Sequence, residues 1–370
     1  MIRRLTLTDF RNYYSLDLHL DPYLNLLWGP NGAGKTNILE AVYLLGLVKS
    51  PRGARDRDLI AWGREAYRVG AEVSRGRSSF RLEIFFHRER GKGARINGVP
   101  QSRPSDVLAS LSVVLFSPDD LALIKGGPAE RRSFLDQQIS QADPRYYQAL
   151  ARYSRVLAQR NQALKAPSGA TQLAGSFDDQ LVQAGSYLLK RRLEALPTLS
   201  SGTASWVDNL SGGEDQAEVS YAGSIQIPPE ADDDSLRASF HEALSRVRGE
   251  ELGRGHTVVG PHRDDLAVSL NGRDSRVYSS QGQKRTLALG LKLQQVGYLE
   301  RAMGHRPVLL LDDVLSELDS RRRSVMIRAL KQGGQTLITS TDPEELGAGG
   351  LFQVEDGRVT VREAKSDDSV

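Results

Sequence analysis

The stretch that decides the fold is Gly29-Pro30-Asn31-Gly32-Ala33-Gly34-Lys35-Thr36, a glycine-rich loop that ends in a lysine and a threonine. An apolar run before the loop (24–28) predicts a short strand, and apolar residues after it (38–45) predict a helix. Glycines let the backbone curl, so that N–H groups and the positive end of the helix face the same phosphate oxygens. Because strand, loop and helix agree, the pattern indicates a nucleoside-triphosphate site rather than a glycine-rich turn.

The residue types in this loop predict individual roles. We expect Lys35 to reach the β- and γ-phosphates of ATP, and the Thr36 hydroxyl to bind Mg²⁺. The predicted nucleotide-binding residues are Gly29, Pro30, Asn31, Gly32, Ala33, Gly34, Lys35, Thr36 and Asn37.

A second motif, Val308-Leu309-Leu310-Leu311 followed by Asp312 and Asp313, has the unbroken apolar pattern of a strand buried on both faces. A carboxylate at the end of such a strand lies at the edge of the sheet where ligands bind. We therefore predict that Asp312 binds Mg²⁺ with Thr36 and that Asp313 polarises the attacking water. The alternative is an aspartate pair that caps the next helix.

A third motif, Ser279-Ser280-Gln281-Gly282-Gln283, precedes a long amphipathic segment and predicts a second anion site at a helix start. The order of the motifs resembles that of ABC-type ATPases, in which the signature serine contacts ATP held by the other protomer. The resemblance implies that Ser280 joins Lys35, Asp312 and Asp313 in the catalytic set. A similar stretch, 210–214, precedes the strand-like alternation of 217–221, so we interpret it as a turn.

Composition limits the class of protein. Hydrophobic residues make up 39% and charged residues 26% of the 370 residues, which is typical of a soluble globular chain. The net charge of +3 permits nucleic-acid binding without requiring it. The absence of cysteine excludes disulfides and thiolate metal sites and favours a reducing compartment. We expect no signal peptide and no membrane span, and hence a cytoplasmic protein.

The wide gap between the first motif and the other two predicts an insertion. Helical spacing fills it at 129–139, 144–165 and 177–196, with a loop at 166–175. The predicted strands lie at 16–20, 67–73, 80–86, 113–116, 256–259, 266–270, 308–311, 336–339, 351–354 and 358–361, and the tail 364–370 is expected to be disordered. We predict an α/β P-loop ATPase head with mixed sheets (1–120 and 254–370) and an inserted, mainly helical arm domain (121–253).

Several further stretches make the chain resemble one family closely: RecF, the bacterial recombinational DNA repair ATPases related to SMC and Rad50 heads. The head would then be of the ABC/SMC type. These stretches are Leu5–Tyr13, Ser117–Leu121, Gly127–Asp136, Gly260–Asp265 and Ser280–Arg285.

The resemblance implies a weak, DNA-dependent ATPase that dimerises with ATP and binds double-stranded DNA at gaps or single-strand/double-strand junctions. It also implies that the protein acts with RecR to help load RecA at gaps and stalled forks. Slow ATP hydrolysis would then release the DNA-binding clamp. Asp313 stands where the superfamily commonly has glutamate, which suits slow turnover. An architectural DNA clamp with negligible hydrolysis is therefore the alternative.

The resemblance leaves four side chains open. Arg11 is expected at the nucleotide, with a surface charge at a sheet edge as the alternative. Arg52 or Arg55 is expected at phosphate or DNA, with a solvated charged loop as the alternative. We expect His262 to be structural, or a hydrogen-bond donor near the third motif, rather than catalytic.

A transporter ATPase is the competing class, and two departures count against it. Transporter ATPases carry a glutamine where this chain has 116–119 and a histidine where it has 340–342. The residue that senses the γ-phosphate is therefore open.

Overall fold

The computed structural model describes residues 1–228, 230–342 and 349–362. The chain forms two compact units, the first from 1–120 and 295–370 and the second from 121–294. The tail for which we expect disorder (364–370) lies outside the described residues.

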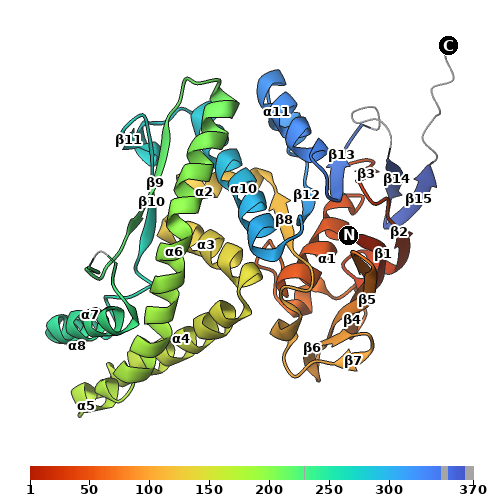
Figure 1. The fold of residues 1–370 in the computed structure, drawn as a ribbon. Helices are drawn as coiled ribbons and strands as arrows, with labels where there is room; N and C mark the ends of the chain where they lie inside the picture. Colours follow the sequence, from red (N-terminus) through yellow and green to blue (C-terminus); the bar gives the residue numbers. More distant parts are fainter. Residues whose placement is uncertain (229, 343–348, 363–370) are drawn as a thin grey trace. The chain divides into compact units, whose positions relative to one another are not determined.

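The first unit contains a six-stranded, mostly parallel sheet (Figure 1). Its order is β15-β14-β3-β13-β12-β8, and among these described strands only β14 and β15 pair antiparallel. Every residue of β12 and β13 is buried, as expected for central strands covered on both faces. The strands are β3 (Leu24–Trp28), β8 (Val113–Phe116), β12 (Val308–Leu311), β13 (Thr336–Ser340), β14 (Gly350–Glu355) and β15 (Arg358–Arg362).

A second sheet in this unit is antiparallel, in the order β2-β1-β4-β5-β6-β7. The predicted strands 67–73 and 80–86 pair antiparallel as β4 and β5, and Asn97 and Gly98 turn with positive φ between β6 and β7. The strands are β1 (Ile2–Phe10), β2 (Tyr13–His19), β4 (Ala66–Arg75), β5 (Ser78–His87), β6 (Gly91–Ile96) and β7 (Val99–Pro100).

Helix α1 (Lys35–Leu47) packs against strands of both sheets. Its residues are buried on nearly every side, because one face covers β8, β12 and β13 while another covers β4 and β5. The phosphate loop at its start is therefore attached to an apolar core of this unit. Helix α11 (Ser320–Lys331) follows β12, and short 3₁₀ turns lie at Asp56–Leu59, Pro104–Val107, Pro118–Leu121 and Leu315–Glu317.

The second unit is mainly helical, as predicted for the insertion, with a small antiparallel sheet in the order β11-β10-β9. Helix α6 packs on β9, α3 packs on β10, and α4 and α7 pack on α6 (Figure 1). The helices are α2 (Ala122–Lys125), α3 (Pro128–Ala142), α4 (Pro144–Ala163), α5 (Ala170–Gly175), α6 (Asp178–Ser211), α7 (Asp233–Arg246), α8 (Arg248–Arg254) and α9 (Ser275–Tyr278). The strands are β9 (Ala217–Ala222), β10 (Asp265–Leu270) and β11 (Arg273–Asp274), and α10 (Gln281–Met303) crosses the division between the units.

Three expectations about these elements are wrong, and two helices were not expected. Helix α6 does not end at 196 but continues through Pro197, because buried side chains on both sides of the proline outweigh its cost of about 3 kcal/mol. The expected loop 166–175 contains α5, and α7 and α8 were not predicted. The expected strand 256–259 is irregular, because the backbone N–H of Thr257 bonds the side chain of Asn161 rather than a neighbouring strand.

The second unit extends to Gln294, past residue 253 where we end the insertion. The physical reason is that β10 pairs with β9, which draws 265–270 into the small sheet of this unit. The functional division into a head (1–120 and 254–370) and an arm (121–253) stays a prediction.

Candidate nucleotide-binding and signature sites

The phosphate loop joins β3 to α1, and two of its glycines are required by close contacts. A Cβ atom on Gly29 (φ 151°) would lie 2.1 Å from a backbone oxygen of β14. A Cβ atom on Gly34 (φ 113°) would lie 2.4 Å from the Asn12 side chain. The Tyr13 hydroxyl donates to the carbonyl oxygen of Gly34 at 3.1 Å, and Asn12 Nδ2 donates to that of Ala33 at 3.1 Å. The loop is therefore held in its curl by the segment between β1 and β2.

Lys35 is buried at 4% exposure. Its Nζ donates to the carbonyl oxygens of Gly29 at 2.7 Å and Pro30 at 3.0 Å, so the ammonium group lies against the start of its own loop. A charge held in this way is ready to exchange these carbonyls for phosphate oxygens, which bind it more strongly.

The sheet order brings the first two motifs together. Since β13 lies between β3 and β12 and all three strands are parallel, the residues after β3 and after β12 meet at one edge. There Thr36 Oγ1 donates to Asp312 Oδ1 at 2.7 Å. The two residues that we predict to bind Mg²⁺ are thus in direct contact.

The hydroxyl and carboxylate oxygens at this point fit Mg²⁺, which prefers hard oxygen ligands. Burial raises the pKa of Asp312, while hydrogen bonds from Thr36 and Thr339 oppose that rise. A buried carboxylate of this kind gains from a nearby cation. Thr36 and Asp312 would hold Mg²⁺ here. The described residues contain no group of three or more His, Cys, Asp or Glu side chains that could hold a metal.

Asp313 follows with a left-handed backbone (φ 52°). Its N–H donates to Thr339 Oγ1 at 2.9 Å, and its carbonyl oxygen accepts from Ser316 Oγ at 2.8 Å. Helix α11 is capped by Asp319, whose carboxylate accepts from the N–H of Arg322 at 2.9 Å. The aspartate pair therefore lies at the sheet edge and does not cap that helix.

The three open arginines of the first unit differ in their surroundings. Arg11 forms a two-point ion pair with the buried carboxylate of Glu40, at 2.8 and 2.9 Å. Arg52 is half exposed and donates to Asn37 Oδ1 at 3.3 Å. Arg55 is exposed on the 3₁₀ turn that starts at Asp56. Arg11 is therefore not a free charge at a sheet edge, and its contact with nucleotide stays a prediction.

The third motif begins helix α10 in the second unit. Ser280 Oγ accepts from the N–H of Gln283 at 3.2 Å, and Gln283 Oε1 accepts from the N–H of Ser280 at 3.0 Å. This reciprocal pair is a capping box, a residue pattern that fixes a helix start. Ser280 is exposed, so its hydroxyl proton remains available to a ligand such as phosphate.

The signature-like stretch 210–214 forms the end of α6 and a turn, with Gly212 in the left-handed region. This agrees with the sequence prediction, and β9 follows as expected. The structure adds a connection, because Asp215 Oδ1 accepts from Gln283 Nε2 at 2.9 Å and from Asn271 Nδ2 at 3.1 Å. The turn thereby anchors the glutamine of the third motif.

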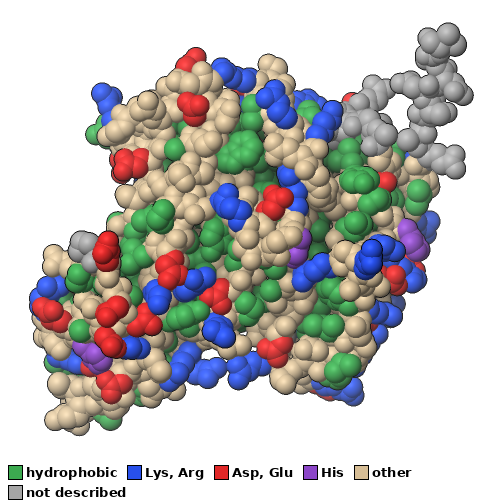
Figure 2. All heavy atoms as spheres, viewed as in Figure 1, with side chains coloured by type: hydrophobic (Ala, Val, Ile, Leu, Met, Phe, Trp, Pro, Cys, Tyr) green, Lys and Arg blue, Asp and Glu red, His purple; other side chains and the backbone are tan. Residues whose placement is uncertain are grey.

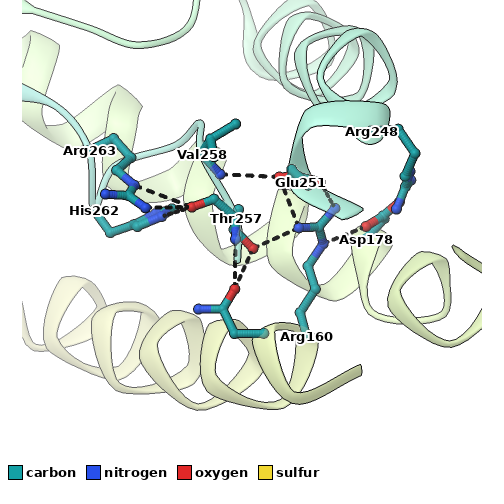
Figure 3. Close-up of polar contacts among 9 residues, drawn as sticks. Arg160, Asp178, Arg248, Glu251, Thr257, Val258, His262 and Arg263 are labelled. Atoms are coloured by element: carbon teal, nitrogen blue, oxygen red, sulfur yellow. Dashed lines mark hydrogen bonds and ion pairs between the residues drawn. The ribbon is translucent and has the colours of Figure 1, made fainter. Parts of the chain in front are cut away.

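His262 belongs to a buried polar network in the second unit (Figure 3). Its Nδ1 lies 2.7 Å from the Tyr153 hydroxyl, and its Nε2 lies 3.2 Å from the carbonyl oxygen of Thr257. The fully buried Arg160 donates to Glu251 at 2.6 and 3.0 Å and to the Thr257 hydroxyl at 2.6 Å. Burial lowers the pKa of His262 to about 4, so a neutral imidazole supports this structure, in line with a structural role.

Sequence reasoning missed two residues of the first site. Thr339, at the end of β13, donates to Asp312 Oδ1 at 3.0 Å and lies between the two motifs. The available signal was its position at the end of the predicted strand 336–339. Glu40 was missed because a single glutamate within an apolar helix looks like an exposed residue, whereas it is 1% exposed.

Comparison with known proteins shows which family the chain resembles. The sequence profile of the RecF/RecN/SMC N-terminal domain matches residues 1–356. The chain is 42% identical over 343 residues to the DNA replication and repair protein RecF of Symbiobacterium thermophilum, covering 92% of both chains. It is 38% identical to the protein of the same name from Halalkalibacterium halodurans, covering 96% of this chain and 98% of that one.

Solved structures agree with the sequence comparison. One described as the recombination mediator protein RecF-ATPrS in the RecFOR pathway superposes with a TM-score of 0.92 at 33% identity, covering 98% of both chains. The Smc head domain from Pyrococcus furiosus superposes with a TM-score of 0.55 at 17% identity, which concerns the fold alone.

The family profile and the solved structures define the class of protein, which is an α/β head of the ABC/SMC ATPase type, as predicted. Within that class, the chain belongs to the RecF family. No helix among the described residues has the length and apolar character needed to cross a membrane.

Proposed function

We propose that this protein is an ATP-dependent DNA-binding protein of recombinational repair. The observation that carries the ATPase part is the contact of Thr36 with Asp312 beside the buried Lys35. It joins a phosphate loop to a carboxylate at the edge of a parallel sheet, as ATP hydrolysis with Mg²⁺ requires. The site residues are those predicted above, with Thr339 added as a contact of both aspartates.

We infer that two copies dimerise on ATP, each supplying Ser280 to the nucleotide of its partner. The capped, exposed start of α10 supports this role, because it presents helix N–H groups and a hydroxyl at the surface. Hydrolysis by Asp313 would be slow and stimulated by DNA, and would release the dimer.

Duplex DNA, in gapped or junction form, is the proposed ligand of the dimer, and RecR the proposed partner in loading RecA. A single copy offers little for non-specific DNA binding at one end of the second unit. Figure 2 shows basic and acidic side chains intermixed over α7 and α8. The ion pairs of this region include Lys190–Asp233 and Arg237–Asp234, both at 2.6 Å. The continuous basic surface that duplex DNA requires is proposed to form in the dimer.

The test is to measure the mass of the protein in solution without nucleotide, with ADP and with ATP, and then to titrate duplex DNA at several salt concentrations. We expect a dimer only with ATP, and DNA binding that needs ATP and weakens with salt through counterion release. A monomer with ATP, or tight ATP-independent binding to one base sequence, would contradict the proposal.

A further inference from the structure

Helix α1 carries a buried carboxylate whose presence is not explained by phosphate binding at the loop that precedes the helix. Glu40 is 1% exposed and lies one turn beyond Asn37. A buried charge is costly unless it is paired, and an apolar residue of similar size would usually stabilise the helix at least as well. The partners that Glu40 binds therefore indicate why a carboxylate stands at this position.

Glu40 binds two segments to α1. Arg11 Nε and Nη2 donate to its two oxygens, and Arg11 Nη1 also donates to the carbonyl oxygen of Asp58 at 3.0 Å. Ser50 Oγ donates to Glu40 Oε1 at 2.5 Å and accepts from the N–H of Arg52 at 3.1 Å. One carboxylate thus fixes the segment 50–58 at both of its ends.

The segment held in this way delivers Arg52 to the nucleotide site. Arg52 Nη1 lies 3.3 Å from Asn37 Oδ1, and Asn37 Nδ2 donates at 2.8 Å to Asn12, which also bonds the phosphate loop. Arg52 therefore lies beside Asn37, the residue that follows Thr36, where its charge can act on the phosphate groups of a bound nucleotide.

We propose that Glu40 is a positioning residue for ATP hydrolysis, which sets the guanidinium of Arg52 beside the phosphate loop through Ser50, Arg11 and a direct ion pair with Arg52 Nη1 at 3.9 Å. The inference rests on the proposed ATPase function. Glu40 is buried against Arg11 and Ser50, and it acts by removing the freedom of the Arg52 segment before ATP binds.

The experiment compares Glu40→Gln, Arg52→Ala and the double variant, with Glu83→Gln as the matched control. Glu83 is another buried carboxylate of the same unit, paired with Arg81 at 3.1 Å on β5 and without a contact to the segment 50–58 among the described bonds. We expect Glu40→Gln to lower kcat at least about ten-fold while KM for ATP changes less than about three-fold. The control should change neither.

The double variant separates positioning from a merely structural role. If Glu40 acts through Arg52, the double variant has the kcat of Arg52→Ala alone, because residues that act as a unit are not additive. Effects that multiply, or an unchanged kcat in Glu40→Gln, would overturn the inference while leaving the proposed function intact. A wild-type chain that does not hydrolyse ATP would overturn both.

A second readout needs no catalysis. Amide hydrogen exchange of residues 50–58 in the nucleotide-free protein should be at least about ten-fold faster in Glu40→Gln and unchanged in Glu83→Gln. If Glu40→Gln does not fold, Ser50→Ala replaces it, since it removes only one of the bonds to Glu40. Unchanged exchange in a folded variant would overturn the inference.

Discussion

At the scale of single residues, we propose that nucleotide affinity depends on the charge of Lys35. Its Nζ is bound by carbonyls of its own loop, and phosphate oxygens would replace them. We expect Lys35→Met to weaken ATP binding about ten- to a hundred-fold, because one charge-assisted contact contributes roughly 1.5–3 kcal/mol. Equilibrium binding of a fluorescent ATP analogue measures this, with the exposed Arg3→Met as control. Equal affinities in wild type and Lys35→Met would show that the loop is wrongly assigned.

We propose that the two aspartates have separate roles, Asp312 in the binding of ATP with Mg²⁺ and Asp313 as the base in hydrolysis. Asp313→Asn keeps the shape of the side chain but removes the base, so it should bind ATP normally, hydrolyse it at least about a hundred-fold more slowly and accumulate as an ATP-bound dimer. Asp312→Asn should instead weaken the Mg²⁺ dependence of binding, since Asp312 contacts Thr36. Single-turnover kinetics and binding at several Mg²⁺ concentrations distinguish them. Hydrolysis at the native rate in both variants would exclude this sheet edge as the site.

At the scale of elements, local pattern predicted the first unit better than the second. Strands β3, β12 and β13 and helix α1 were predictable because burial on both faces leaves an apolar run next to a distinctive loop. Helix α6 through Pro197 was not, because only contacts with α4, α7 and β9 make that length favourable. Thr339 and Glu40 were not predicted as site residues, because their partners are distant in sequence.

The network around His262 makes the stability of the second unit depend on pH. The folded protein lowers the pKa of His262 from 6.5 to about 4, so the unfolded chain binds the proton more readily. The contribution of His262 to the free energy of unfolding should therefore be fully present above pH 6.5. The free energy of unfolding should fall by at most about 3 kcal/mol as the pH drops to 4. Denaturant unfolding of wild type and His262→Gln across this range checks it. Parallel pH profiles would show that His262 does not supply the slope.

The start of α10 should govern association rather than ATP binding by a single copy. Ser280→Arg places a bulky cation at the capped helix start, so dimerisation with ATP should be lost while monomer affinity changes less than about three-fold. Asp215→Ala should weaken dimerisation less, by freeing Gln283. The exposed Glu214→Arg, on the neighbouring turn, is the control. Sedimentation of the three variants with ATP measures this, and loss of the dimer in Glu214→Arg alone would move the signature to that turn.

At the scale of the whole molecule, the proposed sites are shared between two copies, and a mixture of variants can detect this. In a mixed dimer of Lys35→Met and Ser280→Arg, one composite site carries both substitutions. The other combines a native Lys35 with a native Ser280 and is intact.

Each variant alone should hydrolyse ATP at least about ten-fold more slowly than wild type. Their mixture should regain hydrolysis, up to half the wild-type rate per mixed dimer if one site turns over alone. Recovery should rise with the fraction of mixed dimer measured by mass. A mixed dimer that forms but stays inactive would show that both sites must act together. Hydrolysis by Ser280→Arg alone at the native rate would show that each copy completes its own site.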